Sequence, residues 1–537
     1  MSCCLYIVLF INQDCGRTLA NLCANEAKQS MIHSQGGLKT LFHLSKSKSK
    51  VCQRYAAIAL GFMSSNPEVQ KSLSKGYDES HFPFVEFSAS NVRDFQRAAA
   101  SAFASLSLNE TGKSLVLRRG GVKPLLLLCI HLDLTIQKDA VYSIANIVNS
   151  PEFCQYVVKE GGVETIKATA STNTNTEVLR DSARALSSFS INIAAKGIMV
   201  SLEIAKVLCK LVKSSDSATQ RFASLALCNL CMGTREHKEL VVKQGVLRIL
   251  LFLLRFPDLE VERCASLAIA GLALGSNRNK SEVIDSGFVR PLIETITYPD
   301  LRMRQCALLA LNSIALGDLL ETKECVVKEN GLPSLLELIK STDDECIHAG
   351  LFLLGTLGEK MDIRDVLAKT DCLHLVAGTI KAGPIENKRA ASYFLSLLSE
   401  CPEHHDNIRH AGCLESAVTV ASLVDTECQD YGAFVLAFLA NNKSFQVPLV
   451  KMGAVRPLVA MMATNSDSQH HAAMALLKLA DNFENHVTIA EEGGIAALLK
   501  LGKNNTSEAL QYRTALTVGE LAKNASSSVL KELKDNN

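Results

Sequence analysis

The chain has 537 residues, of which 47% are hydrophobic and 21% are charged, and its formal net charge is +1. A balance this close to neutral argues against non-specific nucleic-acid binding, which depends on an excess of Lys and Arg to neutralise phosphates. Most of the eighteen cysteines stand singly in apolar stretches, which favours reduced thiols in a cytosolic or nuclear protein over a secreted disulfide framework.

Residues 1–11 form a short apolar N-terminal segment. The segment is too short to span a bilayer and lacks the basic flank of a secretory signal. We interpret it as the remnant of a helix in preference to an acylation signal on Cys3 and Cys4. We therefore expect no transmembrane segment and a cytoplasmic protein, with nuclear, organelle or cytoskeletal association left open.

A doublet of small residues followed by an apolar run recurs along the chain at a period of roughly 42 residues, which is typical of a solenoid. Eight of the twelve marker positions are Gly, which tolerates positive φ where one helix stops and the next begins. We expect a partial repeat over 12–35, complete repeats to residue 523 and a polar tail over 524–537. The complete units are expected to start near Gly36, Glu79, Gly120, Gly161, Glu203, Gly245, Gly287, Asn330, Asp371, Gly412, Gly453 and Gly493. The abrupt entry at residue 12 is typical of a fragment, because a solenoid needs polar caps.

The unit that starts at Gly245 shows the organisation expected of each repeat. A helix over 246–254 is followed by a turn containing Pro257 and Asp258, then by a longer helix over 259–274. A short helix that carries Val283 and Ile284 completes the period. The sequence therefore predicts three helices per repeat.

The stretches RTLANLCANEAKQSMIHSQGGLKTLFHL and ASLALCNLCMGTREHKELVVKQGVLRILLFLL resemble armadillo repeats of the kind found in β-catenin and in the vacuolar armadillo adaptor. The resemblance covers residues 12–523. It implies an all-α, right-handed superhelical solenoid of about twelve repeats plus a partial first one. It also implies that the longest helix of each repeat lines a concave, protein-binding groove.

Residues spaced by four along the longest helices would point together into such a groove. One row is basic in six units and consists of Arg54, Arg97, Lys138, Arg221, Arg263 and Lys388. This basic row is either a track for an acidic peptide or an edge whose cations are solvated or paired with neighbouring carboxylates. A second row is apolar in successive units and consists of Leu225, Leu267, Leu309 and Phe352. This apolar row is either a partner site or part of the core. The amides at two further positions match those with which groove-binding armadillo proteins bind a peptide backbone. The candidate partner-binding residues are Arg54, Arg97, Lys138, Tyr142, Asn146, Arg221, Leu225, Asn229, Arg263, Leu267, Leu309, Phe352 and Lys388.

No pattern for catalysis rises above background, so we expect no enzyme activity, no catalytic residues and no cofactor. Cys401, His404, His410 and Cys413 have a spacing that zinc would tolerate. Aligned to the repeat, however, they form the ordinary loop that leads into Gly412, and we favour that interpretation and expect no metal.

The sequence thus predicts a non-catalytic scaffold or adaptor that holds extended or helical partner segments, acidic or amphipathic in character. Two alternatives remain: a cargo-transport receptor, and the substrate-binding or regulatory arm of an enzyme complex. The chain contains no Trp, whereas nuclear import receptors of this family use Trp in their grooves, which argues against import-signal binding.

Overall fold

The structure is a computed structural model that describes residues 14–74, 82–463, 468–504 and 508–524. The segment 1–11, the unit start at Glu79 and residues 525–537 of the expected tail lie outside the described residues. All regular structure in the described part of the chain is helical, which confirms the predicted all-α repeat fold. None of these described helices combines the length and apolar character needed to cross a bilayer.

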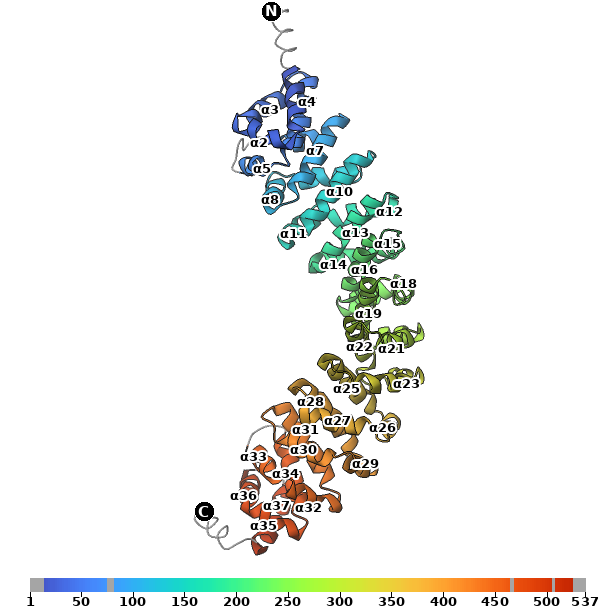
Figure 1. Cartoon of the computed structure of the whole chain (residues 1–537), viewed down its shortest axis with the longest axis vertical. Coiled ribbons are helices and arrows are strands. Elements are labelled where there is room, and N and C mark those ends of the chain that lie inside the picture. Colours follow the sequence, from blue (N-terminus) through green and yellow to red (C-terminus); the bar gives the residue numbers. More distant parts are fainter. Residues whose placement is uncertain (1–13, 75–81, 464–467, 505–507, 525–537) are drawn as a thin grey trace, which may run out of the picture. The chain divides into compact units, whose positions relative to one another are not determined.

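The chain forms two compact units, residues 1–279 and 280–537. In each unit the longest helices of successive repeats pack on one another, from α4 to α19 in the first unit and from α22 to α34 in the second (Figure 1). In the first unit a helix over 14–23 precedes α4 (Lys50–Met63), α7 (Arg93–Leu106), α10 (Leu134–Val148), α13 (Thr176–Ile191), α16 (Ser217–Cys231) and α19 (Leu259–Ala273). In the second unit the long helices are α22 (Leu301–Ala315), α25 (Asp344–Gly358), α28 (Ile385–Ser399), α31 (Thr426–Leu439), α34 (Ser468–Leu479) and α37 (Glu508–Asn524).

Two shorter helices separate successive long ones, as the repeat pattern predicts. In the first unit they are α2 (Glu26–Ser34), α3 (Gly37–Ser45), α5 (Pro67–Ser74), α6 (Pro83–Ser88), α8 (Glu110–Arg118), α9 (Val122–Cys129), α11 (Pro151–Lys159), α12 (Gly162–Thr172), α14 (Ile193–Ser201), α15 (Ile204–Leu211), α17 (Arg235–Lys243) and α18 (Val246–Leu253). The boundary between the units falls inside α20 (Asn277–Asp285). The second unit continues with α21 (Val289–Thr295), α23 (Leu320–Lys328), α24 (Gly331–Leu338), α26 (Met361–Leu367), α27 (Cys372–Ala382), η1 (Pro402–His404), α29 (His405–His410), α30 (Cys413–Ala421), α32 (Lys443–Lys451), α33 (Val455–Met462), η2 (Phe483–Asn485), α35 (His486–Glu491) and α36 (Gly494–Asn504).

The marker positions set the sharp turn between the two short helices. Gly245 has φ 85° and caps α18, a conformation that glycine adopts without steric cost. At Glu203 the same left-handed conformation persists without glycine, with φ 54°. Asp371 departs from the rule with φ −69°, so the turn before α27 is built differently.

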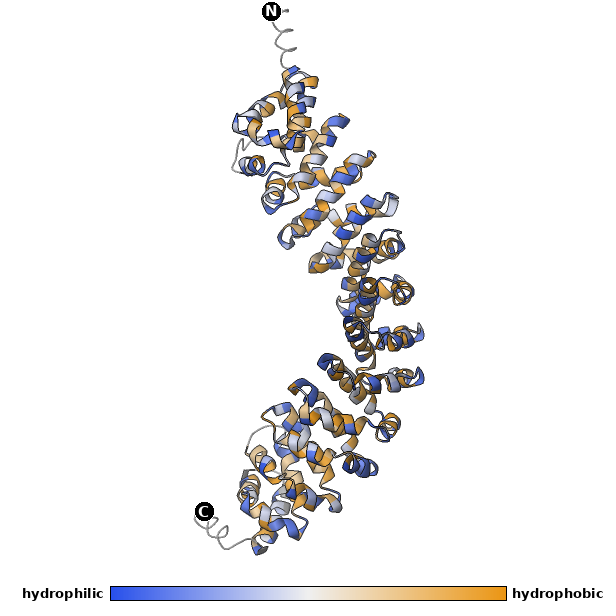
Figure 2. Cartoon of the chain, viewed as in Figure 1, coloured by the Kyte–Doolittle hydropathy of each residue, from blue (hydrophilic) through white to orange (hydrophobic). Residues whose placement is uncertain are grey.

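Small and apolar side chains fill the space between neighbouring helices. In α7, Ala98, Ala99, Ala100 and Ala102 are buried, and their small size lets adjacent backbones approach closely. Figure 2 shows hydrophobic and hydrophilic residues interleaved along the helices of both units, as expected when one side of a helix is buried. Each fully buried Leu or Phe adds about 1.5–3 kcal/mol to this layered core.

The divergent second repeat keeps the same packing with aromatic residues. Phe82, Phe84 and Phe87 are buried, and the rings of Phe82 and Phe84 meet edge to face at 5.2 Å. Phe84 also lies 6.4 Å from Phe103 of the long helix α7. The short helix α6 therefore packs as part of a repeat, with Phe in place of Leu.

Candidate partner-binding surface

From α4 to α34, one side of each long helix is exposed or half-buried, and we call this side the long-helix face. The predicted apolar row lies on it: Leu225 is 39% exposed on α16, Leu309 is 50% exposed on α22 and Phe352 is 36% exposed on α25. Leu267 of α19 is half-buried at the corresponding position. Apolar side chains that are exposed or half-buried therefore recur at equivalent positions of these repeats.

Arg54, Arg97 and Arg221 of the predicted basic row are exposed, whereas Lys138, Arg263 and Lys388 are half-buried, and most of these cations are bound to carboxylates. Arg54 Nε lies 2.7 Å from Asp94, Arg97 Nη2 lies 2.9 Å from Asp133, and Arg221 Nε lies 2.7 Å from Asp258. Lys138 pairs with Glu177, and Arg263 pairs with Glu260. All five cations therefore pair with neighbouring carboxylates, which is one of the two interpretations of this row.

Two of these carboxylates also cap the next long helix. Asp133 accepts hydrogen bonds from the backbone N–H of Thr135 and Ile136 at the start of α10, at 2.9 and 3.3 Å. Asp258 accepts from Glu260 N at 3.0 Å at the start of α19. One carboxylate therefore stabilises a helix terminus and binds a cation of the preceding repeat.

The pKa of Asp133 reflects this double role. Burial raises this pKa, but hydrogen bonds from Arg93, Arg97 and the two backbone N–H groups outweigh burial and lower it to about 2. Hydrogen bonds from Arg389 lower the pKa of Asp425 to about 2 in the same way. These carboxylates are ionised at neutral pH and compensate the nearby basic charge.

Lys388 lies one residue away from the row to which it was assigned. Arg389 holds the equivalent position on α28, because it binds Asp425, the cap of α31, as Arg221 binds Asp258, the cap of α19. The position is displaced because the last fully buried apolar residue of α28 is Leu398 and not Leu397. Lys388 is half-buried and has no ion-pair partner among the described residues.

The amides of Asn146 and Asn229 make bonds to the preceding repeat. Asn146 Nδ2 donates to Ser107 Oγ at 2.9 Å, and Asn229 Nδ2 donates to Ser190 Oγ at 2.9 Å. The Asn146 carbonyl also accepts from Arg184 at 2.6 Å. These amides are held in place on the long-helix face, and one N–H of each is already used.

Sequence reasoning missed Arg184, which joins two predicted residues. Its guanidinium lies 5.2 Å from the centre of the Tyr142 ring and donates to Asn146. Arg184 also binds Asp181 of the same helix at 2.8 Å. The available signal was Phe189, the last large apolar residue of α13 that is buried. Counting back in steps of four from Ser188, the residue before it, gives Arg184 and Arg180.

Tyr393 and Tyr431 are further missed residues on the long-helix face of the second unit. The Tyr393 ring lies 6.1 Å from Phe352 and 5.7 Å from Tyr431, so three successive repeats contribute one aromatic cluster. Burial and a hydrogen bond to Glu359 raise the pKa of Tyr393, so its hydroxyl stays protonated at neutral pH. A depression of about 330 Å³ opens beside these rings.

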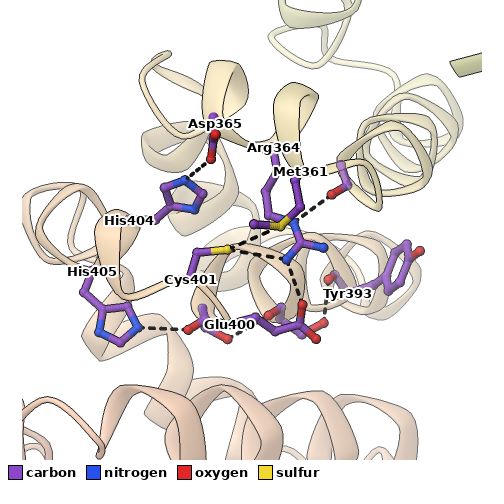
Figure 3. A network of polar contacts seen from close by, with 11 residues as sticks. Met361, Arg364, Asp365, Tyr393, Glu400, Cys401, His404 and His405 are labelled. Atoms are coloured by element: carbon purple, nitrogen blue, oxygen red, sulfur yellow. Dashed lines mark hydrogen bonds and ion pairs between the residues drawn. The ribbon is translucent and has the colours of Figure 1, made fainter. Parts of the chain in front are cut away.

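Cys401, His404 and His405 make structural contacts, whereas His410 is exposed (Figure 3). His404 Nε2 lies 2.9 Å from Asp365 Oδ1, and His405 Nε2 lies 2.9 Å from the Ser399 carbonyl oxygen. Cys401 Sγ accepts from Arg364 at 3.6 Å. Within the described residues, no group of His, Cys, Asp or Glu side chains is arranged to hold a metal ion.

Arg364 of α26 links the segment around residue 401 to α25, the long helix of the preceding repeat. It donates Nε to the Gly358 carbonyl at 2.8 Å, at the end of α25, and Nη1 to Glu400 at 2.7 Å (Figure 3). Burial also raises the pKa of nearby Cys413 to about 12, which keeps this thiol protonated and a poor nucleophile at neutral pH. The network stabilises the junction between two repeats.

No protein-family model matches the chain, and no curated protein matches it. Solved structures do match. One is an engineered protein determined by the Northeast Structural Genomics Consortium, with a TM-score of 0.69 and 27% identity over 76% of this chain and 98% of that chain. Another comes from work on a phosphorylation switch that controls the interaction between cadherin and β-catenin, with a TM-score of 0.66 and 14% identity over 90% of this chain and 98% of that chain. The second likeness shows an armadillo-like helical repeat fold.

Proposed function

We propose that this protein is a non-catalytic scaffold or adaptor that binds extended or helical segments of partner proteins on its long-helix faces. The observation that carries the proposal is the exposure of Leu225, Leu309 and Phe352 at equivalent positions of their repeats. Apolar residues held on rigid helices serve as pockets and anchors for peptide side chains, and neighbouring amides orient the peptide backbone.

The charge pattern favours amphipathic over purely acidic partners. Arg97, Arg221 and Arg263 already pair with the protein's own carboxylates, so an acidic segment would have to compete with Asp133, Asp258 and Glu260. Arg221 is exposed, and surface ion pairs are worth about 1 kcal/mol or less, so competition with Asp258 is feasible. Asp133 is buried, so its pair with Arg97 is harder to displace. Apolar contacts supply most of the binding energy in this proposal, and the paired charges select orientation.

The work on cadherin and β-catenin concerns a protein–protein interaction in a structure with a similar fold. Its low identity to this chain carries over no partner and no binding residue. It supports protein partners as a class, and cytoplasmic adaptor function is our proposal on that basis.

The test uses peptides selected from a random library displayed on phage. Binding of the selected peptides is measured for wild type, for Leu225→Glu with Leu267→Glu, and for Leu309→Glu with Phe352→Glu. The controls are Leu240→Glu on α17 and Leu320→Glu on α23, which are equally exposed Leu residues outside the long helices.

We expect at least one of the two double variants to weaken binding about tenfold or more, while melting temperatures and both control variants stay unchanged. Equal loss of binding in the controls would move the contact surface away from the long helices. Unchanged binding in both double variants would overturn the proposal.

A further inference from the structure

A depression in the second unit lies between the long helices α25, α28 and α31. Its volume is about 330 Å³, and aromatic rings and carboxylates line it together. Phe352, Tyr393 and Tyr431 line it, and we call these three rings the aromatic wall. The rest of the lining comes from Glu386, Glu427, His348, Ala390 and Arg389. Each of the three helices therefore contributes an aromatic ring, and two of them contribute a carboxylate.

The aromatic wall depends on a glycine. The Tyr393 ring lies against Gly355 of α25 so closely that a Cβ there would come within 2.6 Å of Tyr393 Cε1 and 2.7 Å of Cδ1. The tyrosine hydroxyl bonds to Glu359, the residue that follows α25. Tyr393 is thus held at both ends, with its ring 6.1 Å from Phe352 and 5.7 Å from Tyr431.

The charges around the wall leave an excess of carboxylate. Arg389 is engaged by Asp425, with Nε–Oδ1 at 3.1 Å and Nη2–Oδ2 at 2.6 Å, so its charge is largely compensated. Glu427 lies farther from the same guanidinium, at 3.5 Å. The Glu386 carboxylate has no hydrogen-bond or ion-pair partner among the described residues, although its backbone carbonyl lies 3.0 Å from His348 Nδ1.

Two further groups bear on this balance. Asp430 of α31 has a buried oxygen, Oδ1, without a hydrogen-bond partner in the described part of the chain. Lys388, which precedes Arg389 on α28, has no carboxylate partner among the described residues and is half-buried. Burial raises the pKa of Tyr431, and Glu427 and Asp430 raise it further, which agrees with a negative potential at the wall. Glu386 and Glu427 therefore add negative charge to the lining of the depression beyond the Arg389–Asp425 pair.

We propose that this depression receives an arginine side chain from the partner segment. Aromatic faces attract a cation through the ring quadrupole, and the guanidinium is planar and weakly hydrated, so it stacks on tyrosine more readily than an ammonium does. Glu386 and Glu427 then supply the carboxylates that accept its N–H groups. An acidic or purely aliphatic side chain would leave these carboxylates repelled or unpaired. The inference rests on the proposed peptide-binding function and adds a specificity site to it.

The test uses three fluorescein-labelled peptides that share an extended leucine-containing sequence and differ at one central residue: arginine, its neutral isostere citrulline, or glutamate. Affinities are measured by fluorescence anisotropy for wild type and for the Glu386→Gln, Glu427→Gln double variant. The matched control is Glu403→Gln with Glu415→Gln, which makes the same change in net charge at exposed carboxylates of η1 and α30.

We expect wild type to bind the arginine peptide about tenfold more tightly than the citrulline peptide and to bind the glutamate peptide most weakly. The preference for arginine should disappear in the Glu386→Gln, Glu427→Gln variant and persist in the charge-matched control. Gly355→Ala provides a second variant, because it displaces the Tyr393 ring without changing any charge and should also reduce the preference.

The outcomes separate the two proposals. Equal binding of the arginine and citrulline peptides, with both weakened by Leu309→Glu, would overturn the arginine site and leave the scaffold function intact. Loss of the preference in the charge-matched control would show a long-range effect of net charge and would also overturn the site. Failure of all three peptides to bind wild type would count against both proposals.

Discussion

Arg389 of α28 donates Nε and Nη2 to the carboxylate of Asp425, and Asp425 in turn accepts a hydrogen bond from Cys428 N at the start of α31. The arginine therefore holds the residue that caps the next helix. Arg180 with Asp216 repeats this arrangement between α13 and α16, at 2.7 Å. A single carboxylate thus couples the geometry of two successive repeats.

Asp425→Ala should destabilise the junction between α28 and α31. The change removes the helix cap and the partner of Arg389, which together should cost about 1–2 kcal/mol. The measurement is hydrogen exchange of the backbone amides in α28 and α31, compared with Glu415→Ala on the exposed side of α30. Equal exchange in the two variants would show that the pair does not stabilise the junction.

Asp133 should make stability depend on acid pH. Its pKa in the folded protein is about 2, below the value of about 3.9 for an unfolded Asp. A lowered pKa gives stabilisation that is fully present above about pH 4 and is lost as the pH falls towards 2. Asp133→Asn keeps a capping side chain but does not titrate, so its melting temperature should fall less steeply with pH than that of wild type. Parallel curves would contradict the assignment.

Leu230→Asp and Leu225→Asp should differ strongly although both lie on α16. Leu230 is 0% exposed and would place an unpaired charge in the core, which should cost more than about 3 kcal/mol. Leu225 lies on the long-helix face, so the same substitution should cost less than about 1 kcal/mol. Thermal melting and hydrogen exchange in α16 measure the difference. Similar losses in both variants would mean that Leu225 is part of the core.

Asp258→Asn should increase affinity for acidic peptides. Asn caps a helix nearly as well as Asp, so α19 should persist, while Arg221 loses its compensating carboxylate. Anisotropy with a glutamate-rich peptide at low salt should show tighter binding, and added salt should remove the gain. If the affinity does not change, Arg221 does not contact the peptide.

Purified protein should contain no stoichiometric zinc at Cys401 and His404. These side chains are engaged by Arg364 and Asp365, so binding zinc would require the loss of both contacts. We expect an unchanged melting temperature after treatment with EDTA and no zinc by elemental analysis. One zinc per chain that is lost in Cys401→Ser would contradict this expectation.

The sequence by itself determined the repeat and the ends of its helices. The helices expected over 246–254 and 259–274 match α18 and α19 to within one residue. Helix ends are local: they depend on capping residues and on residues that accept positive φ, such as Gly245. The all-α fold follows from the same period, because each unit can bury its apolar side only against its neighbours.

The surface was determined in part. Leu225 and Leu309 of the apolar row lie on the exposed side of their helices, as four-residue spacing within one helix predicts. Positions in the basic row are counted back from the last buried apolar residue of each long helix. In α28 Leu397 and Leu398 are adjacent, and periodicity alone does not show which of them is buried, so counting from Leu397 gives Lys388 instead of Arg389. Burial of Leu398 decides the register, and burial depends on the neighbouring helices.

Only the tertiary structure decided which charges are compensated and which rings meet. Arg389 and Asp425 are separated by 36 residues, and Phe352, Tyr393 and Tyr431 come from three repeats. Such contacts depend on how one repeat packs on the next, which a pattern within a single helix does not contain. The packing of the Tyr393 ring against Gly355 also depends on two repeats, because a glycine without Cβ on α25 makes room for a ring on α28.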